Sequence, residues 1–513
     1  MEEFRQPGEV KLFFPYAETH FKFRLPWSPL HKRWPEIFLD APCQVLSGKP
    51  FSVYLLIKDA DLYPVTIRSL ELRLEDVHGN VTEQQFELNL HCEQNLMYRA
   101  FPLSREGFSG TLRLSGWITV ADKKGKSVRF LSHNFPGLHS RPLEIRLLNH
   151  PLPYPENWKA GEMHCHSEFS SDPVEFGAPL RLMQETADAV GLDFVLCTDH
   201  SYDFYYHRYS YLDSIEPEGN FREYRNQAIA LNSEHPDLPT LIPGEEVSCG
   251  NSHGENVHLL VFGHDHFLPG LGDGGRRGFQ NHPDLTIAEI LERLPGIPTF
   301  AAHPKAQIGW LERKIFRRGE WRQEDLKSNI IQGLQFWNGN LGLDYREGKT
   351  FWIKQLLKGQ RILPIAANDA HGDFNQNIGV KLPLVSLKQQ RSHVFGKVRT
   401  VVPCASRDIG ALRSAFLGEC CVCTDGPFVN VSRKGHLLEV EARSNPDFGS
   451  LHSVHVYVAE SGACLEKVYD DWSFAKDSME LKATLPSPKS GYVRAEVVTR
   501  NGNRALCSAL FVN

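Results

Sequence analysis

The sequence has no excess of positive charge and no long apolar run. Lys and Arg total 56 against 62 Asp and Glu, which gives a formal net charge of −6. Binding to a nucleic-acid backbone normally needs a basic surface, so we predict no nucleic-acid partner. No apolar stretch approaches the length of a membrane span. The N-terminus, MEEFRQPGEVKLFF, lacks the charged start and apolar core of a secretory signal. We therefore predict a cytoplasmic protein with no membrane partner.

The sequence also lacks the cysteine pattern of a disulfide framework, because its 11 cysteines are odd in number and scattered, which suits reduced thiols. Hydrophobic residues make up 41% and charged residues 23%, near the averages for soluble globular proteins, which excludes disordered, collagen-like and coiled-coil classes. A length of 513 residues is enough for about three domains.

Both ends of the chain are predicted to form β-sandwiches. Within residues 1–150, apolar and polar residues alternate in 51–57 (FSVYLLI) and 111–120 (TLRLSGWITV), which indicates half-buried strands of an immunoglobulin-like sandwich. Residues 396–513 contain a helix-like segment, 406–418, followed by further alternating strands. We expect a C-terminal helix plus β-sandwich there.

The middle of the chain, residues 155–395, has a different pattern. Amphipathic segments are followed by short apolar ones: 179–190 by 194–198, 286–294 by 299–303, and 348–358 by 362–369. Repeated helix–strand units predict a parallel sheet or barrel, whose functional groups gather at the carboxyl ends of the strands.

Metal-ligating residues follow these strands. His164 and His166 are two apart in GEMHCHSEFSSD, so in an extended segment both imidazoles project to one side and can hold one metal ion. Four further segments carry similar residues: Asp199 and His200 in LCTDH, Glu245 and Glu246 with the later His258, His303 in TFAAH, and Asp369 and His371 in ANDAH. Nitrogen and oxygen ligands suit zinc, manganese or iron. A metal-dependent hydrolase is the function class that this pattern favours.

Taken in order, the HxH pair, TDH, a G-x-E turn, an isolated histidine, an HP pair and a final DxH resemble the polymerase-and-histidinol-phosphatase (PHP) domain over roughly residues 161–375. The flanking sandwiches and the segment CTDGPFVNV are similar to the CehA/McbA-like branch of PHP metallohydrolases. The resemblance implies a distorted (β/α)7 barrel with up to three metal ions.

The resemblance also implies three ligand groups. His164, His166, Glu246 and Asp369 would hold the first ion, Glu246, His258 and His303 the second, and Asp172, His200 and His371 the third. The G-x-E spacing selects Glu246 over Glu245. Two positions depart from the family pattern, because Ser171 precedes Asp172 and Gln335 stands where relatives often have glutamate. Nine candidate ligands exceed what one ion uses, so we expect two to three divalent Mn, Zn or Fe ions.

The predicted reaction is hydrolysis of a small phosphate ester by a metal-bound hydroxide. His371 is the candidate for stabilising the leaving group, and Asp199 is the candidate for orienting an imidazole. Candidate substrate contacts are Arg276 and Arg277 in a glycine-rich loop, Lys305 after the HP pair, Asn338, and Tyr202 in an aromatic wall after TDH.

Alternative functions remain open at this level. The CehA/McbA resemblance allows a carbamate, ester or amide hydrolase that uses the same metals, and a non-catalytic binding scaffold is a third reading. An amidohydrolase barrel also begins with HxH, but the TDH and DxH pairs argue against it. The sequence leaves the substrate, the metal and the oligomeric state undetermined.

Overall fold

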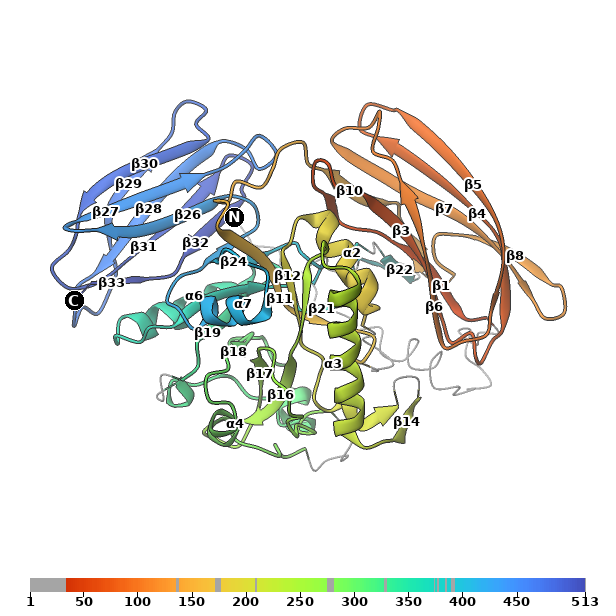
Figure 1. Ribbon diagram of the computed structural model, residues 1–513, viewed down its shortest axis with the longest axis horizontal. Helices are drawn as coiled ribbons and strands as arrows, with labels where there is room; N and C mark the ends of the chain where they lie inside the picture. The colour runs from red at the N-terminus through yellow and green to blue at the C-terminus, as the bar shows by residue number, and fades with distance from the viewer. Residues whose placement is uncertain are drawn as a thin grey trace.

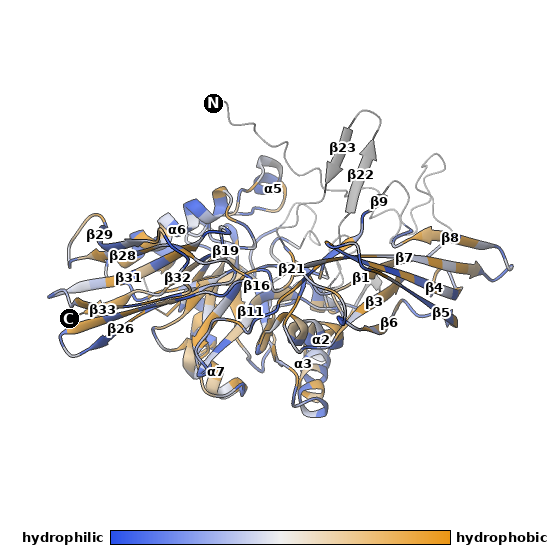
Figure 2. Ribbon diagram, turned by 90° about the horizontal axis from the view of Figure 1, so that it is seen from above, coloured by the Kyte–Doolittle hydropathy of each residue, from blue (hydrophilic) through white to orange (hydrophobic). Residues whose placement is uncertain are grey.

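Two strand-rich wings flank an α/β body in the computed structural model (Figure 1). The structure describes residues 34–134, 138–170, 177–207, 210–274, 281–326, 330–372, 374–375, 378–382, 385–388 and 393–512. Seen from above, the two wings lie at opposite ends with the body between them (Figure 2). None of the helices in these ranges is long and apolar enough to cross a membrane.

The N-terminal wing contains two sheets that share one core. The first sheet has the order β1 (Glu36–Asp40), β3 (Phe51–Lys58) and β6 (Leu96–Leu103). The second contains β2 (Gln44–Val45), β4 (Val65–Asp76), β5 (Val81–Cys92), β7 (Thr111–Asp122), β8 (Ser127–Leu131) and β10 (Leu143–Leu147). Alternation along β4 buries Leu70, Leu72 and Leu74 against the first sheet, as the period-two pattern predicts.

The body contains the predicted alternation of helices and strands. Helix α2 (Leu180–Val190) leads into β12 (Phe194–Cys197), α4 (Ile287–Arg293) into β18 (Thr299–Ala302), and α6 (Leu343–Leu356) into β20 (Leu363–Ala367). The other elements are β11 (Trp158–His166), α3 (Pro217–Glu234), β15 (Thr240–Pro243), β16 (Glu245–Gly250), β17 (Asn256–Val261), α5 (Trp310–Ile315), β19 (Gly333–Asn338) and β21 (Ala370–His371).

The body strands form two sheets, and no closed barrel is present in the described part of the chain. One sheet contains β15, β12 and β11 in parallel, and the other has the order β16-β17-β18-β19-β20. Strands β16 and β17 form an antiparallel hairpin, and β17 is also antiparallel to β18. The fold is therefore mixed α/β with several sheets, because the hairpin interrupts the repeated parallel units that the sequence predicts.

The first body sheet continues into the C-terminal wing. Strand β24 (Arg399–Pro403) pairs with β11 and with β25 (Val422–Thr424), and β25 pairs with β32 (Arg504–Cys507). The sheet is completed by β31 (Gly491–Thr499), β28 (Leu451–Ala459), β29 (Lys467–Ser473) and β33 (Leu510–Val512), and it faces a second sheet of β26 (Phe428–Lys434), β27 (Leu437–Arg443) and β30 (Glu480–Pro486). Hydrogen-bonded strands thus cross the predicted boundary at residue 396.

Short elements complete the chain: β9 (Leu138–Ser140), β13 (Tyr206–His207), β14 (Ser210–Ser214), β22 (Ile378–Leu382), β23 (Val385–Lys388), α7 (Ile409–Phe416) and the 3-10 turns Asp203–Tyr205 and Glu324–Leu326. The two wings also contact each other. The Asp447 carboxylate of the C-terminal wing accepts hydrogen bonds from the backbone N–H groups of Asn149 and His150 at 3.0 and 2.8 Å.

A buried ion cluster joins the C-terminal wing to α6. Arg494 is 1% exposed and donates to both Glu466 oxygens at 2.7 and 2.6 Å, and it also pairs with Glu496. Lys349 of α6 donates to Glu496 at 2.7 Å. Burial opposes ionisation of Glu496, but Arg494 and Lys349 lower its pKa to about 2. The carboxylate therefore stabilises the folded state when it is ionised.

Gly161 of β11 should tolerate no side chain. A Cβ atom there would lie 2.1 Å from the Phe194 ring, whereas a Cβ at Gly219 in α3 would meet nothing within 4 Å. We expect Gly161→Ala to lower the free energy of unfolding by about 1–3 kcal/mol. The control Gly219→Ala should raise it by roughly 0.5–1 kcal/mol. Urea unfolding checks both, and equal midpoints would contradict the packing.

Glu496→Gln should reduce stability in a pH-dependent way. The folded pKa lies below the unfolded value, so the contribution of Glu496 is present above about pH 4.3 and is lost as the pH falls to about 2. Burial lowers the pKa of Lys349, which offsets part of the gain. We expect a loss of about 2 kcal/mol at pH 7 that disappears near pH 2. The control is exposed Glu480→Gln, and a pH-independent difference between the two variants would contradict this assignment.

Candidate metal centre

Eight of the nine predicted ligands lie together at one end of the body strands. They are His164 and His166 of β11, His200 after β12, Glu246 of β16, His258 of β17, His303 after β18, Asp369 after β20, and His371 of β21. The ninth, Asp172, lies outside the described residues. Segments more than 200 residues apart in the chain are therefore neighbours here.

The first predicted ligand group is assembled as a compact polyhedron. His164 Nε2 lies 3.1 Å from both Glu246 Oε2 and Asp369 Oδ1, and His166 Nε2 lies 3.3 and 3.2 Å from the same two oxygens. The two Nε2 atoms are 3.2 Å apart. Ligands about 2.0–2.1 Å from one zinc ion are separated by roughly 2.9–3.4 Å in octahedral or tetrahedral geometry. The four atoms fit the edges of such a site.

Glu246 extends the cluster in a second direction. Its Oε1 lies 2.6 Å from His258 Nδ1 and 3.2 Å from His303 Nε2, while its Oε2 lies 2.9 Å from His200 Nδ1. The ligand atoms of His200, Glu246 and His258 lie within 4.8 Å of one another. The predicted second group was Glu246, His258 and His303. In the structure His200 joins Glu246 and His258, and His303 contacts this group at the Glu246 Oε1 oxygen.

The third group differs from its predicted membership. His166, His200 and His371 bring one nitrogen each within 4.8 Å of one another. The His371 ring stacks on the His166 ring with centroids 3.9 Å apart. His200 and His371 were predicted here, whereas His166 takes part in two groups at once.

Among the described residues, two buried ligand atoms of the cluster lack the hydrogen bonds that buried polar atoms normally make. Glu246 Oε2 and His200 Nδ1 are buried and make no hydrogen bond in the described part of the chain, although they lie 2.9 Å apart. A buried carboxylate oxygen among three ring nitrogens, without hydrogen-bond geometry, has the arrangement of a metal ligand. The cluster can hold one or more metal ions, and the residues fit the predicted group.

Outer hydrogen bonds set the orientation of four histidine rings. Nδ1 of His164 donates to Gln335 Oε1 at 2.9 Å, and Nδ1 of His371 donates to the Asp369 carbonyl at 3.0 Å. Each acceptor is an oxygen without a proton, which assigns the hydrogen to Nδ1 and turns Nε2 toward the cluster. His166 is held at Nδ1 in the same manner by the Ser170 hydroxyl, whereas His258 is held at Nε2 by Asp273 and turns Nδ1 toward Glu246.

Asp199 contacts His166 indirectly, through the Ser170 hydroxyl on the side of the ring away from the cluster. It is fully buried and accepts hydrogen bonds from the Ser167 hydroxyl at 2.6 Å and the Ser170 hydroxyl at 2.7 Å. Ser170 Oγ lies 3.2 Å from His166 Nδ1. The structure therefore places Asp199 one hydroxyl away from an imidazole, an orienting position rather than one facing the reacting atoms.

Glu245 and Glu246 point to opposite sides of β16. Glu245 accepts from the Ser201 hydroxyl at 2.6 Å and lies 3.1 Å from His264 Nε2, outside the cluster. This is the alternation expected of neighbours in a strand. The ligand role of Glu246 stays a prediction, but its position is the one that the G-x-E spacing selects.

The predicted substrate contacts fall into three groups. The Tyr202 ring stacks on His200 at 4.4 Å, and Asn338 Nδ2 lies 3.4 Å from Asp369 Oδ2, so both residues border the cluster. Lys305 is engaged elsewhere, because its ammonium donates to Glu320 at 3.3 Å and to the Trp321 carbonyl at 2.9 Å. Arg276 and Arg277 lie outside the described residues.

Three further residues border the cluster, and the sequence analysis missed two of them, Asp273 and His393. Asp273 contacts His258 Nε2 at 2.9 Å and is paired with Arg318 Nε at 2.6 Å. Gln335 binds His164, and His393 lies with Nδ1 4.0 Å from Asp369 Oδ2 and 41% of its side chain exposed. Asp273 and His393 follow no strand of the body, so no strand-end pattern could find them.

Charge pairing dominates the protonation of the metal-free cluster. Burial disfavours the charged forms, but Glu246 and Asp369 raise the pKa of His164 to about 9, and Asp273 and Glu246 raise the pKa of His258 to about 10. The pKa of Glu246 is held well below its usual range despite burial, by His164, His258 and His200. At neutral pH, protons therefore occupy positions that a metal ion would take.

Two of these residues have a strained backbone. His303 has φ 28° and Asp369 has φ 52°, in the left-handed region that non-glycine residues rarely adopt. His303 directly follows β18 and Asp369 is the second residue after β20, where the chain must turn each side chain into the cluster. Such strain is typical of functional sites and persists because the surrounding contacts stabilise it.

Metal binding should release protons. Because His164 and His258 are protonated below pH values of about 9 and 10, an ion must displace about two protons, and affinity should rise with pH between 6 and 8. Titration calorimetry with Zn²⁺ or Mn²⁺ in two buffers of different ionisation enthalpy measures the number released. His258→Gln should reduce it by about one, whereas exposed His266→Ala should not change it. Binding without proton release would contradict this protonation state.

Comparisons with known proteins leave the family open. No protein-family model and no curated protein matches the chain. A hypothetical protein from Pyrococcus horikoshii OT3 is 14% identical over 18% of this chain and 89% of that chain, with a TM-score of 0.15. Superoxide reductase (neelaredoxin) from Archaeoglobus fulgidus is 14% identical over 17% and 88%, with a TM-score of 0.15. A β-D-mannosidase from Dictyoglomus thermophilum is 9% identical over 93% and 66%, with a TM-score of 0.24. Likeness at this level carries no functional conclusion.

Proposed function

We propose that this chain is a metal-dependent phosphoesterase of PHP type that hydrolyses a small phosphate ester. The observation that supports it best is the position of Glu246, whose two carboxylate oxygens face separate sets of histidines. A carboxylate can bridge two cations, whereas a single imidazole nitrogen cannot. This arrangement suits a site of two or more closely spaced ions.

The charge of the ligand set favours an anionic substrate. The described cluster contains two carboxylates, Glu246 and Asp369, and its other ligands are imidazoles. Two or three divalent ions would therefore leave a net positive charge, which attracts a phosphate ester. Bound divalent ions supply a lowered water pKa and polarisation of phosphoryl oxygens.

The protein's own residues orient this chemistry. Gln335, Asp273 and the Ser170–Asp199 pair each hold one imidazole in a single orientation. Tyr202 forms an apolar wall against His200, and Asn338 presents an amide beside Asp369. In this proposal His371, which is partly exposed, faces the leaving group.

A carbamate, ester or amide hydrolase is the second candidate. The observation that favours it is the engagement of Lys305 by Glu320 and by the Trp321 carbonyl, which removes one predicted anion contact. A neutral carbonyl substrate needs no such cation. Metal ions held by the same ligand set would polarise a carbonyl oxygen.

Glu246→Gln should lower metal content and activity together. It removes the negative charge that faces both histidine sets, so we expect at least one metal equivalent to be lost and turnover to fall about 1,000-fold or more. Glu245→Gln, on the opposite face of β16, is the matched control and should keep its metals. Elemental analysis and hydrolysis of p-nitrophenyl phosphate measure the two effects.

The substrate class is tested on the metal-loaded wild-type chain. Faster hydrolysis of p-nitrophenyl phosphate than of a phosphodiester or a naphthyl carbamate supports the proposal. Preference for the carbamate would favour the second candidate. Less than one metal equivalent after purification in manganese or zinc would exclude both.

A further inference from the structure

The N-terminal wing contacts the segment that follows His371. This segment leaves the cluster at Gly372, whose φ of 67° turns the chain sharply, and runs to the first sheet of the wing. The wing contributes none of the eight clustered ligands. Its contact with this segment nevertheless connects it to the cluster through only a few residues.

Asp40, the last residue of β1, holds the segment by its backbone. Its carboxylate is fully buried and accepts hydrogen bonds from the N–H groups of Phe374 and Asn375, both at 2.9 Å. The Asn375 side chain donates in return to the Pro42 and Glu144 carbonyls at 3.3 and 2.9 Å. Four hydrogen bonds therefore fasten two residues of the segment to the wing.

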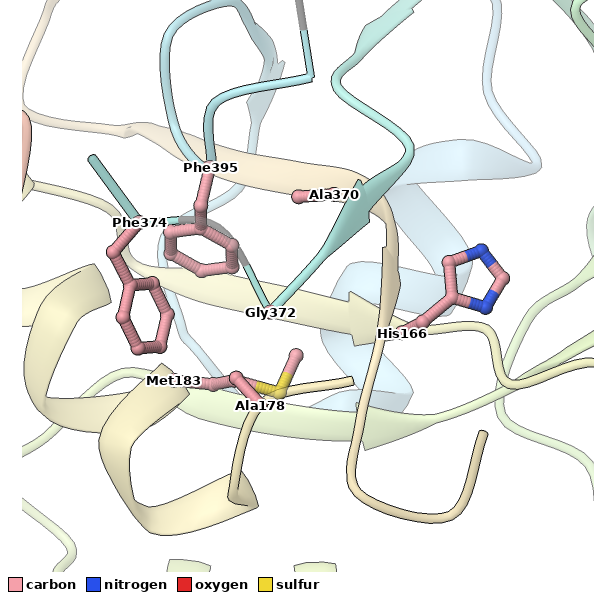
Figure 3. Close-up of a pocket in the computed structure, with 7 residues that line it drawn as sticks. All are labelled: His166, Ala178, Met183, Ala370, Gly372, Phe374 and Phe395. Atoms are coloured by element: carbon pink, nitrogen blue, oxygen red, sulfur yellow. The ribbon is translucent and has the colours of Figure 1, made fainter. Parts of the chain in front are cut away.

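Aromatic packing fixes the same segment from the other side. The Phe374 ring lies edge-on to Tyr54 of β3 and to Phe395, with centroids 5.6 Å from each. Figure 3 shows Phe374 and Phe395 beside Gly372 at a small apolar hollow, with His166 at its other end. The hollow therefore lies between Phe374 and the ligand His166.

A second backbone contact follows along the chain. Strand β22 pairs antiparallel with β9, so that Ile378 lies opposite Ser140 and Val380 opposite Leu138. The segment is therefore held at Phe374 and Asn375 and again from Ile378 onward. On its other side, His371 is held by β11, because Cys165 and His166 pair with Ala370 and His371.

We infer that Asp40 is a positioning residue for His371, and that the N-terminal wing completes the metal site by holding Phe374 and Asn375, which lie shortly after His371 in the chain, in place. This inference rests on the proposed function, because it assigns His371 to the group with His166 and His200. His371 is the one member of that group that is not fully buried, and the chain that follows it is held by the wing at Phe374 and Asn375.

The test compares Asp40→Ala with Asp76→Ala in the full chain. Asp76 is the matched control, because it is also a buried aspartate of the same wing that accepts from three backbone N–H groups, those of His78, Asn80 and Ser109. Asp40 likewise accepts from Ala41, Phe374 and Asn375. Of the two aspartates, Asp40 is the one that contacts Phe374 and Asn375.

Two measurements are independent of catalysis. We expect Asp40→Ala to weaken binding of the weakest Mn²⁺ equivalent about 10–100-fold by titration, the usual effect of losing an outer support of a ligand. Hydrogen exchange of the peptide covering 370–375 should speed at least about tenfold. Asp76→Ala should change neither. If Asp40→Ala does not fold, Asp40→Asn, which keeps one acceptor oxygen, should show smaller effects in the same direction.

The outcomes separate this inference from the proposed function. Equal metal affinity and equal exchange in the Asp40 and Asp76 variants would overturn the positioning role. A wild type that binds no metal would overturn both inferences. A wild type that binds metal but hydrolyses no phosphate ester would overturn the phosphoesterase alone, and the titration and exchange results would still decide the role of Asp40.

Discussion

The Glu246 carboxylate is the interaction on which the rest of the site depends. It is 1% exposed and lies within 3.3 Å of nitrogens from five histidines on four segments of the chain. A buried carboxylate is costly unless it is paired, and here every partner is an imidazole that also needs an acceptor or an ion. The strand ends therefore converge on one charge, and their backbones accept strain at His303 and Asp369 to do so.

A second layer of polar groups makes that convergence specific. The buried Glu162 carboxylate accepts from the backbone N–H groups of His164, Asn368 and Gly396, which ties β11 to the segment that carries Asp369. Asp199, Asp273 and Gln335 hold ring nitrogens from outside. Because these groups are buried, each has few alternative partners, and the imidazoles are oriented before any ion binds.

The wings contribute to this site through the framework rather than through ligands. The C-terminal wing shares a hydrogen-bonded sheet with β11, and a buried ion cluster connects it to α6. The N-terminal wing holds the turn after His371. The described strands of the body do not close into a barrel. Both wings instead contact the body segments that carry the site.

The sequence by itself determined the residue types of the site and the strands that carry them, since apolar alternation and strand-end His, Asp and Glu are local patterns. Strand alternation predicted that Glu245 and Glu246 face opposite sides, and the G-x-E spacing of the family resemblance selected Glu246. Only the tertiary structure decided which histidines share an ion group, and it added His166 to His200 and His371. It alone showed Asp273, His393 and Asp40 near the cluster or its supporting turn. These residues arrive from loops and from another wing, and contacts across such distances in the chain depend on how the sheets pack, which no local spacing encodes.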